Sequence, residues 1–407
     1  MKAALGQWLF GVLLVVTGNI LLGIFYGLGW PERLSLFMIS CVLVPVWIRI
    51  QTREKVKWEE YHDMTAYLEL FLCSFKKTGH IKMTLEDCQL VFHESGKMGK
   101  VVRKAVHILE TGETVGEETV TKSALYEIER DYRCRRMKLL HRFICHVASI
   151  GGNAAEEMDI LLADLEMWKR RFVLYHKKKR YIGRECMLAA VLSIVLCGLS
   201  HCLIPIEFQE LLNSNLLYRI STTVVFVLLM CSVMFIRYLT GNVLMESFRE
   251  KKRKKLVERE FPYWLLSVTL YLHQESLYHA LFQSAEETEG IFRHEIDCLI
   301  EKIYQSPLSL QPYLDFFADL DVPELRTGMK MLYAVNTNGY QDTKKQIHFL
   351  VEQNNAVLDQ SEREFYRMKL ASLRLLRQLP MMLAGGKVII DMVIFLMIML
   401  GRVTVIS

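Results

Sequence analysis

The sequence predicts an all-α, polytopic membrane protein in which two repeated, antiparallel six-helix-like bundles alternate with about five transmembrane helices. Three observations support this fold class. Five long apolar runs are spread along the chain, apolar positions between them recur at helical spacing, and no stretch alternates in polarity over the length of a strand. Hydrophobic residues make up 52% of the chain and charged residues only 23%, the balance expected when part of the chain lies in a bilayer.

The apolar runs are predicted to form two membrane hairpins and one final span. A helix of about 20 apolar residues crosses a hydrocarbon core of ~30 Å, a length that 34–48 only approaches, so whether this run fully spans stays open. The first run is too long for a signal peptide and is followed by the turn Pro31-Glu32-Arg33 rather than by a small-residue cleavage site. The expected spans are 8–30, 34–48, 186–206, 220–236 and 381–400.

Lys and Arg lie mostly on one side of these spans. They crowd the ends of the two long loops, whereas the short opposite loops carry only Arg33 and Arg219. The positive-inside rule therefore predicts a cell-membrane protein with a cytoplasmic N-terminus, two cytoplasmic loops and an external tail. The densest cluster faces either an acidic protein surface or anionic lipid, and the same alternatives apply to 177–180. That cluster is Arg249, Lys251, Lys252, Arg253, Lys254 and Lys255.

The two long loops share one plan and are predicted to be repeats. Each opens with an amphipathic helix, reaches a glycine break, and continues as a long charged helix that feeds straight into a membrane span. The first loop is expected to break at Gly79, 95–96 and 111–112. Its first helix is expected to bury the stripe Met64, Tyr67, Leu68, Phe71, Leu72 and Phe75. The predicted segments are the N-terminal hairpin 1–49, the first bundle 50–185, the central hairpin 186–236, the second bundle 237–380, and the last helix with its tail, 381–407.

Glycine breaks precede the long charged helix of each loop. The first is Gly151, Gly152 and Asn153, and the second is Asn338 and Gly339. Glycine readily takes the positive φ that ends a helix, and asparagine caps the next one. A helix stop and restart is the ordinary interpretation of both breaks, and a corner at which a partner docks is the alternative.

Lys387 and Asp391 stand one helical turn apart inside the last apolar run. A lone charge at the centre of a bilayer costs at least ~2.5–3.5 kcal/mol, so such residues usually face protein or water. One interpretation is a contact within the membrane, to another helix or a partner, with close approach at Gly385-Gly386. The alternative starts the span near Val388, with Lys387 at the cytoplasmic interface and only Asp391 submerged. His201, near the outer end of the third span, is expected to be a satisfied interfacial histidine.

No motif for catalysis or cofactor binding is present. The chain has no P-loop, no Gly-rich dinucleotide loop, no His-Glu-x-x-His and no Gly-x-Ser-x-Gly. The ten cysteines lack zinc spacing, and a net charge of +5 is too mild to indicate a nucleic-acid partner. We therefore expect no enzymatic activity, no catalytic residues, no cofactor, no metal and no nucleic acid.

The arrangement resembles the type II secretion system F family, the platform proteins of secretion machines and of type IV and Tad (Flp) pili. The residues that carry the resemblance are the run 150–156, Arg170-Arg171, Arg184, and the pairs Phe261-Pro262 and Leu379-Pro380. The extra N-terminal hairpin is similar to the Tad pilus assembly branch. The resemblance implies an inner-membrane platform that couples a cytoplasmic secretion ATPase to the extraction and polymerisation of pilin or pseudopilin subunits. It also implies a homodimer or pairing with a paralogous platform protein, in contact with membrane lipid.

The alternative from another functional class is a secondary membrane transporter that uses the Lys387/Asp391 pair. Transporters place polar sites on broken helices in paired positions near the membrane midplane. Only this pair qualifies, and most of the chain lies in the two long loops. The platform is therefore the first hypothesis.

Overall fold

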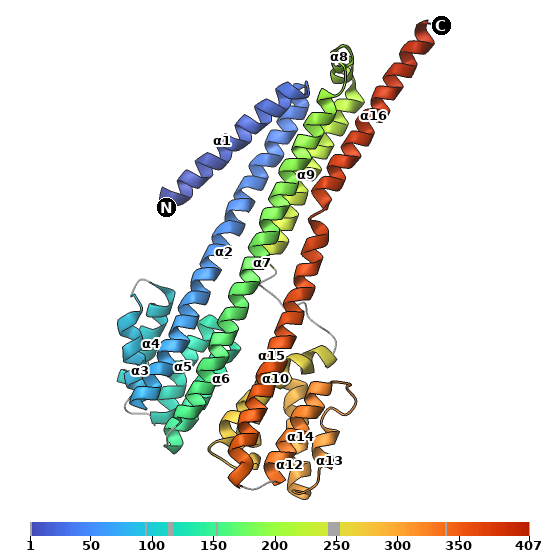
Figure 1. Cartoon of the computed structure of the whole chain (residues 1–407). Helices are drawn as coiled ribbons and strands as arrows, with labels where there is room; N and C mark the ends of the chain where they lie inside the picture. The colour runs from blue at the N-terminus through green and yellow to red at the C-terminus, as the bar shows by residue number, and fades with distance from the viewer. Residues whose placement is uncertain are drawn as a thin grey trace. The chain divides into compact units, whose positions relative to one another are not determined.

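The computed structural model describes residues 2–93, 96–112, 117–151, 154–242, 253–337 and 340–406 (Figure 1). Every regular element within these ranges is a helix, so the all-α prediction is confirmed. The helices are α1 (Lys2–Phe25), α2 (Trp30–Thr78), α3 (Ile81–Val91), α4 (Lys97–Thr111), α5 (Glu117–Tyr132), α6 (Arg135–Ile150), α7 (Ala155–Cys202), α8 (Ile206–Ser214), α9 (Leu216–Asn242), α10 (Arg253–Leu272), α11 (Leu277–Glu286), α12 (Gly290–Gln305), α13 (Gln311–Asp315), α14 (Pro323–Thr337), α15 (Tyr340–Leu376) and α16 (Leu379–Ile406).

The chain divides into two compact units. The apolar unit comprises Met1–Trp58, Val173–Glu246 and Tyr366–Ser407, and the loop unit comprises Glu59–Phe172 and Ser247–Phe365. The helices α2, α7 and α15 contribute residues to both units.

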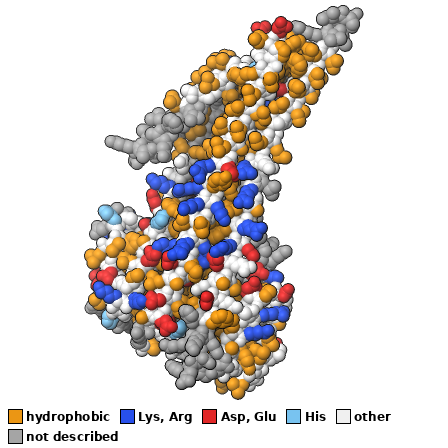
Figure 2. Space-filling view, viewed as in Figure 1, with side chains coloured by type: hydrophobic (Ala, Val, Ile, Leu, Met, Phe, Trp, Pro, Cys, Tyr) orange, Lys and Arg blue, Asp and Glu red, His pale blue; other side chains and the backbone are white. Residues whose placement is uncertain are grey.

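The apolar unit has the composition of a multi-pass membrane protein. Within the described residues, four helices are long and apolar enough to cross a membrane: Trp30–Thr78, Ala155–Cys202, Leu216–Leu239 and Leu379–Leu400. A shorter apolar segment, Val15–Phe25, belongs to α1. Figure 2 shows apolar side chains along these helices and a band of Lys and Arg where the apolar surface ends. The sequence prediction of a multi-pass membrane protein fits these helices.

The turn of the first hairpin lies earlier than predicted. The expected turn Pro31-Glu32-Arg33 is the first turn of α2, and the actual connection follows α1 and contains Gly27 at a φ of +56°. Proline is tolerated here because the first N–H groups of a helix have no partner within it. Arg219 on α9 donates to both carboxylate oxygens of Glu32, at 2.7 and 2.8 Å. A Cβ on Gly29 would lie 1.8 Å from the Arg219 guanidinium, so this glycine makes room for the ion pair.

The predicted first helix of the loop unit buries the expected stripe. Tyr67, Leu68, Phe71 and Leu72 on α2 are at most 1% exposed, and α2 ends at Thr78, one residue before the predicted break. Gly79 has a φ of +69°, which a residue with a side chain rarely adopts. The helices α4 and α6 end at the predicted breaks 111–112 and Gly151, whereas α3 ends at Val91, four residues before the predicted break at 95–96, and α5 ends at Tyr132, where the sequence predicted none.

The long charged helices of the two loops end differently. The helix α7 continues unbroken into the apolar segment, as predicted. The helix α15 stops at Leu376, and a turn at 377–378 separates it from α16, so the prediction of a continuous helix is wrong for the second loop. Pro380 explains the break, because its ring would clash with the carbonyl of residue 376 and it has no N–H to donate.

One hydrophobic core joins both loops of the loop unit. A single set of packed, buried side chains runs from Tyr61 on α2 through Phe143 on α6 to Trp264 on α10 and Leu332 on α14. The helices α6 and α10 therefore come from different loops and pack against each other. The segments predicted as two bundles share one interior.

Candidate functional site

The first candidate site is a buried charge pair in the apolar unit, at the residues that the sequence analysis singled out. Lys387 and Asp391 on α16 are 0% and 2% exposed, and the Lys387 ammonium donates to Asp391 Oδ1. The ammonium lies 4.3 Å from the ring centroid of Tyr218 and 6.0 Å from that of Tyr26. Such cation–π contacts stabilise a desolvated cation. His201 on α7 completes the group, which we call the intramembrane cluster: Lys387, Asp391, Tyr218, Tyr26 and His201.

Histidine in this cluster is satisfied, as expected. His201 is buried, and its Nδ1 lies 2.8 Å from the Tyr218 hydroxyl. The ring of Tyr26 packs on His201 with centroids 5.1 Å apart. Asp391 is different, because its Oδ2 is buried and accepts no hydrogen bond within the described residues. A buried carboxylate oxygen without a donor is costly, so the Lys387 ammonium at Oδ1 is the contact that stabilises this carboxylate.

Two expectations about this segment can be compared with the packing of the chain. Lys387 is enclosed by protein, because it is 0% exposed and packs on the rings of Tyr26 and Tyr218. Within the described residues a Cβ on Gly385 or Gly386 would meet nothing within 4 Å, so the close approach at these glycines is not made within the chain, and one to a partner stays a prediction. The aromatic rings, rather than the glycines, bring α16 against its neighbours.

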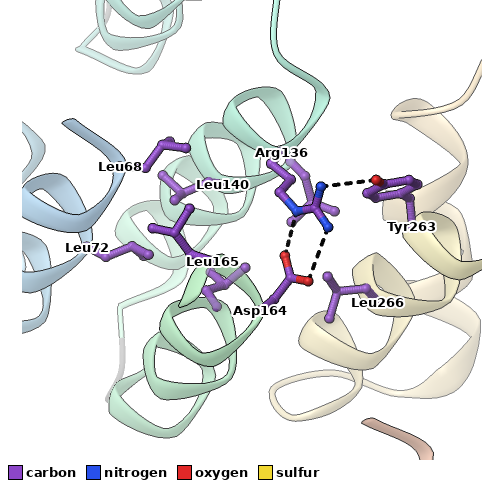
Figure 3. A pocket seen from close by; sticks show the side chains of 10 residues that line it. Leu68, Leu72, Arg136, Leu140, Asp164, Leu165, Tyr263 and Leu266 are labelled. Atoms are coloured by element: carbon purple, nitrogen blue, oxygen red, sulfur yellow. Dashed lines mark hydrogen bonds and ion pairs between the residues drawn. The ribbon is translucent and has the colours of Figure 1, made fainter. Parts of the chain in front are cut away.

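The second candidate site lies in the loop unit, where the two loops meet. Arg136 on α6 donates from Nε to Asp164 Oδ2 on α7 at 2.8 Å, and from Nη2 to Oδ1 at 3.4 Å (Figure 3). Its Nη1 donates to the Tyr263 hydroxyl on α10 at 3.1 Å. The side chains of Arg136 and Asp164 are only 10% and 4% exposed. We call these three residues the junction cluster.

Aromatic and apolar side chains enclose the junction cluster. The Arg136 guanidinium lies 4.9 Å from the ring centroid of Trp168 and 5.1 Å from that of Tyr263. Arg135 covers the same tyrosine at 4.8 Å. A cavity of about 20 Å³, lined mainly by leucines such as Leu140 and Leu165, lies beside the ion pair (Figure 3). The bidentate ion pair of Arg136 and Asp164 thus lies within the first loop, and Arg136 contacts the second loop through its hydrogen bond and cation–π contact with Tyr263.

Further polar contacts link the loops around the junction cluster. Arg142 on α6 donates to the carbonyl of Glu286 at 3.1 Å, and Gln274 donates to Glu157 Oε1 at 3.3 Å. Phe143 packs on Tyr271 with ring centroids 5.7 Å apart. The junction is thus a packed interface along α6 rather than one isolated contact.

Each loop also encloses a polar group, the buried His141 in the first and the half-buried Glu287 in the second. In the first loop, His141 lies 3.0 Å from the Tyr67 hydroxyl and 3.1 Å from Glu129 Oε1. In the second, Glu287 accepts from Ser267 at 2.6 Å and from Tyr271 at 2.7 Å. Burial raises the pKa of the Glu287 carboxyl, and the two donated hydrogen bonds lower it in part. The hydrogen bonds explain how these polar groups are tolerated in the interior.

The remaining predicted sites are only partly visible. Gly151 has a φ of +73° and ends α6, which fits a helix stop. Gly152, Asn153, Asn338 and Gly339 lie outside the described residues, as do Arg249, Lys251 and Lys252. Arg253 binds Asp319 at 2.8 Å and Glu295 at 3.1 Å, so it is engaged by acidic side chains of its own loop. Lys254 lies 3.8 Å from Glu258, and the side chain of Lys255 is not described.

The sequence analysis missed the junction cluster. Arg136 and Asp164 stand 28 residues apart, and Tyr263 belongs to the other loop. Only the position of Asp164 within the apolar stripe of α7 gave a signal, because a carboxylate there needs a cation. In the part of the chain that is described, no group of His, Cys, Asp and Glu could hold a metal ion.

Comparison of the chain with protein families, with curated proteins and with solved structures finds no match.

Proposed function

We propose that the chain is the inner-membrane platform of a type II secretion or Tad-type pilus assembly machine. In this proposal both long loops are cytoplasmic repeats that receive a secretion ATPase, and about five spans contact pilin or pseudopilin subunits. The ATPase supplies the motion, and the platform transmits it to the membrane helices, from which pilins are extracted and polymerised. The chain itself performs no chemistry.

The observation that carries the proposal is that two loops distant in the sequence share one hydrophobic core. A platform that transmits force needs its receiving parts to move together. The junction cluster contributes to this connection. Arg136 on α6 binds Asp164 on α7 within the first loop, and it also donates a hydrogen bond to Tyr263 on α10 of the second loop. The helices α2 and α7 then lead without interruption from the loop unit into the apolar unit. A push on either loop therefore reaches helices that fit a membrane.

The order of helices in the two loops supports the proposed repeat. The first loop comprises the end of α2, then α3 to α6, then the start of α7. The second comprises α10 to α14, then α15. Within the described residues, each loop thus has six helical segments, the last of which is long and precedes an apolar helix.

A pull-down from the native host tests the proposal. The tagged full-length chain is solubilised in detergent, and the proteins that co-purify are identified by mass spectrometry. We expect a P-loop secretion ATPase together with a small pilin-like protein, and a second copy or a paralogue of the platform. Arg136→Ala should reduce recovery of the ATPase, whereas Arg293→Ala, which breaks an exposed pair with Asp297 at 3.0 Å, should not. Recovery of neither the ATPase nor a pilin would contradict the proposal.

The intramembrane cluster favours one second candidate, a secondary transporter. A buried, ion-paired lysine and aspartate among tyrosines and a histidine is the kind of group that lines a transport pathway. For this candidate, vesicles that contain the purified chain should take up a solute, and Asp391→Asn should abolish uptake. The absence of uptake for any solute gradient or proton gradient would remove it.

A further inference from the structure

The apolar unit contains a hollow that neither candidate function uses. It has a volume of about 300 Å³, at the lower end of the sizes of small-ligand pockets. We call it the basic hollow. It is built by side chains from α2, α7 and α9, of which the argument uses Glu54, Lys55, Trp58, Lys179, Arg180 and Arg237.

The basic hollow carries more positive charge than its own carboxylate neutralises. Lys179 lies 2.9 Å from Glu54 Oε1, and Arg237 lies 3.0 Å from Glu54 Oε2. Glu54 thus holds two cations in place, although its charge balances only one. Lys55 and Arg180 also line the hollow, so four cations face one carboxylate, a formal excess of three positive charges. A concave surface with this excess attracts an anion.

The basic hollow lies where the apolar runs end. The apolar run of α2 ends at Ile48 and that of α9 at Ile236, one residue before Arg237. Glu54 is six residues beyond Ile48, about 9 Å along a helix at 1.5 Å per residue. Lys179 precedes the apolar run of α7 by a similar distance. The headgroup layer of a bilayer occupies this level.

Two tryptophans mark the same level. The Arg180 guanidinium lies 5.8 Å from the ring centroid of Trp58, and that of Arg237 lies 5.4 Å from that of Trp47. Tryptophan is enriched at the membrane interface, where its ring meets headgroups. The cations of the hollow are therefore held on interfacial rings.

The face of α7 above Arg180 is apolar and exposed. Met187 and Val191, seven and eleven positions farther along, share a helix face with Arg180. They are 45% and 55% exposed. A free phosphate would use the cations alone, whereas a phospholipid would use the cations for its headgroup and this apolar face for its acyl chains.

We propose that the basic hollow binds the phosphate-bearing headgroup of one anionic phospholipid per chain. The site does not depend on the platform function, only on the apolar helices lying in a membrane. The lipid phosphate lies among Lys55, Lys179 and Arg180, and its acyl chains follow α7. Bound lipid ties α2, α7 and α9 together at the level where these helices leave the bilayer.

Native mass spectrometry of the full chain in detergent tests the proposal. The probes are phosphatidylglycerol, phosphatidylcholine as the neutral lipid, and inorganic phosphate in large excess. We expect the wild type to retain one phosphatidylglycerol, no phosphatidylcholine, and the same phosphatidylglycerol when phosphate is added. Lys55→Gln with Arg180→Gln should weaken retention on the order of 25-fold, from about fivefold for each cation near an anionic surface.

The matched control is Lys177→Gln with Lys178→Gln. These two lysines are exposed and carry the same total charge as Lys55 and Arg180. They lie on α7, as Arg180 does, but they do not line the hollow. The control should change retention less than twofold. Equal losses in the two double variants would overturn the proposal in favour of diffuse surface attraction, and displacement of the lipid by inorganic phosphate would overturn it in favour of a free anion.

Melting temperatures separate a lost site from a lost fold. Lys55 and Arg180 are exposed, so the double variant should melt like the wild type without lipid. Added phosphatidylglycerol should raise the melting temperature of the wild type and of the control, but not that of the double variant. If the double variant melts lower, Arg180→Gln alone is compared with Lys178→Gln, and equal retention in these two would also overturn the proposal.

Discussion

Replacing Arg136 by alanine should destabilise the junction between the two loops. The change removes the cation from Asp164, whose side chain is 4% exposed, and the donor from Tyr263. Removing one partner of a buried ion pair costs about 3–5 kcal/mol, because the remaining charge stays desolvated and unpaired. Solvent screening reduces this cost only slightly, because the side chains of Arg136 and Asp164 are nearly enclosed.

The assay for this variant is thermal unfolding of the full chain in detergent, followed by fluorescence. Trp168 and Trp264 both lie in the loop unit and report on its core. For a body of about 150–250 residues, 1 kcal/mol shifts the melting temperature by about 2–4 °C, so the expected loss is about 6–20 °C. The exposed pair of Arg293 and Asp297 supplies the control, since Arg293→Ala should cost less than about 1 kcal/mol.

A double-mutant cycle separates the ion pair from the packing. Arg136→Leu combined with Asp164→Leu removes both charges and should recover most of the stability that either single change loses. The account is refuted if Arg136→Ala lowers the melting temperature no more than Arg293→Ala does. It is also refuted if the loss in the double variant equals the sum of the two single losses.

Three other changes test separate parts of the structure. Burial raises the pKa of Glu287, so the folded chain keeps the proton on this carboxyl to higher pH than the unfolded chain does. The stability of the folded chain should therefore fall as pH rises from about 4.5 through the raised pKa. Glu287→Gln should abolish that fall when melting temperatures are recorded across pH. Gly29→Ala places a Cβ on the Arg219 guanidinium and should cost about 1–3 kcal/mol by thermal unfolding, whereas Gly18→Ala, with nothing within 4 Å, should cost nothing. Lys387→Met leaves its paired carboxylate buried and should lower the yield of folded protein from membranes and its melting temperature, by about 3–5 kcal/mol, and replacing that carboxylate by leucine as well should restore both.

Local patterns in the sequence predicted the helices well. The spacing of Tyr67, Leu68 and Phe71 identified the buried face of α2, because a stripe at helical period must find an apolar neighbour. Gly79 and Gly151 marked helix ends for the same local reason, a positive φ that other residues rarely adopt. Proline was less reliable: Pro31 suggested a turn, although it lies in the first turn of α2.

Local sequence patterns did not predict the contacts between segments that are distant in the sequence. Nothing near Arg136 in the sequence indicates Tyr263, which is 127 residues away. The burial of Lys387 likewise depends on Tyr26 and Tyr218, which two other segments bring to it. The sequence showed that the Lys387 charge needed compensation, but only the packing of the helices determines which side chains supply it.

Deletion of the gene in the native host tests the central claim most directly. The readout is the display of surface filaments and the set of secreted proteins, with the wild-type chain and Arg136→Ala restored in separate strains. The platform account predicts that deletion abolishes filaments or secretion, that the wild type restores them, and that Arg136→Ala does not. A deletion strain that keeps its filaments and secreted proteins but loses uptake of a solute would contradict the platform and favour the transporter.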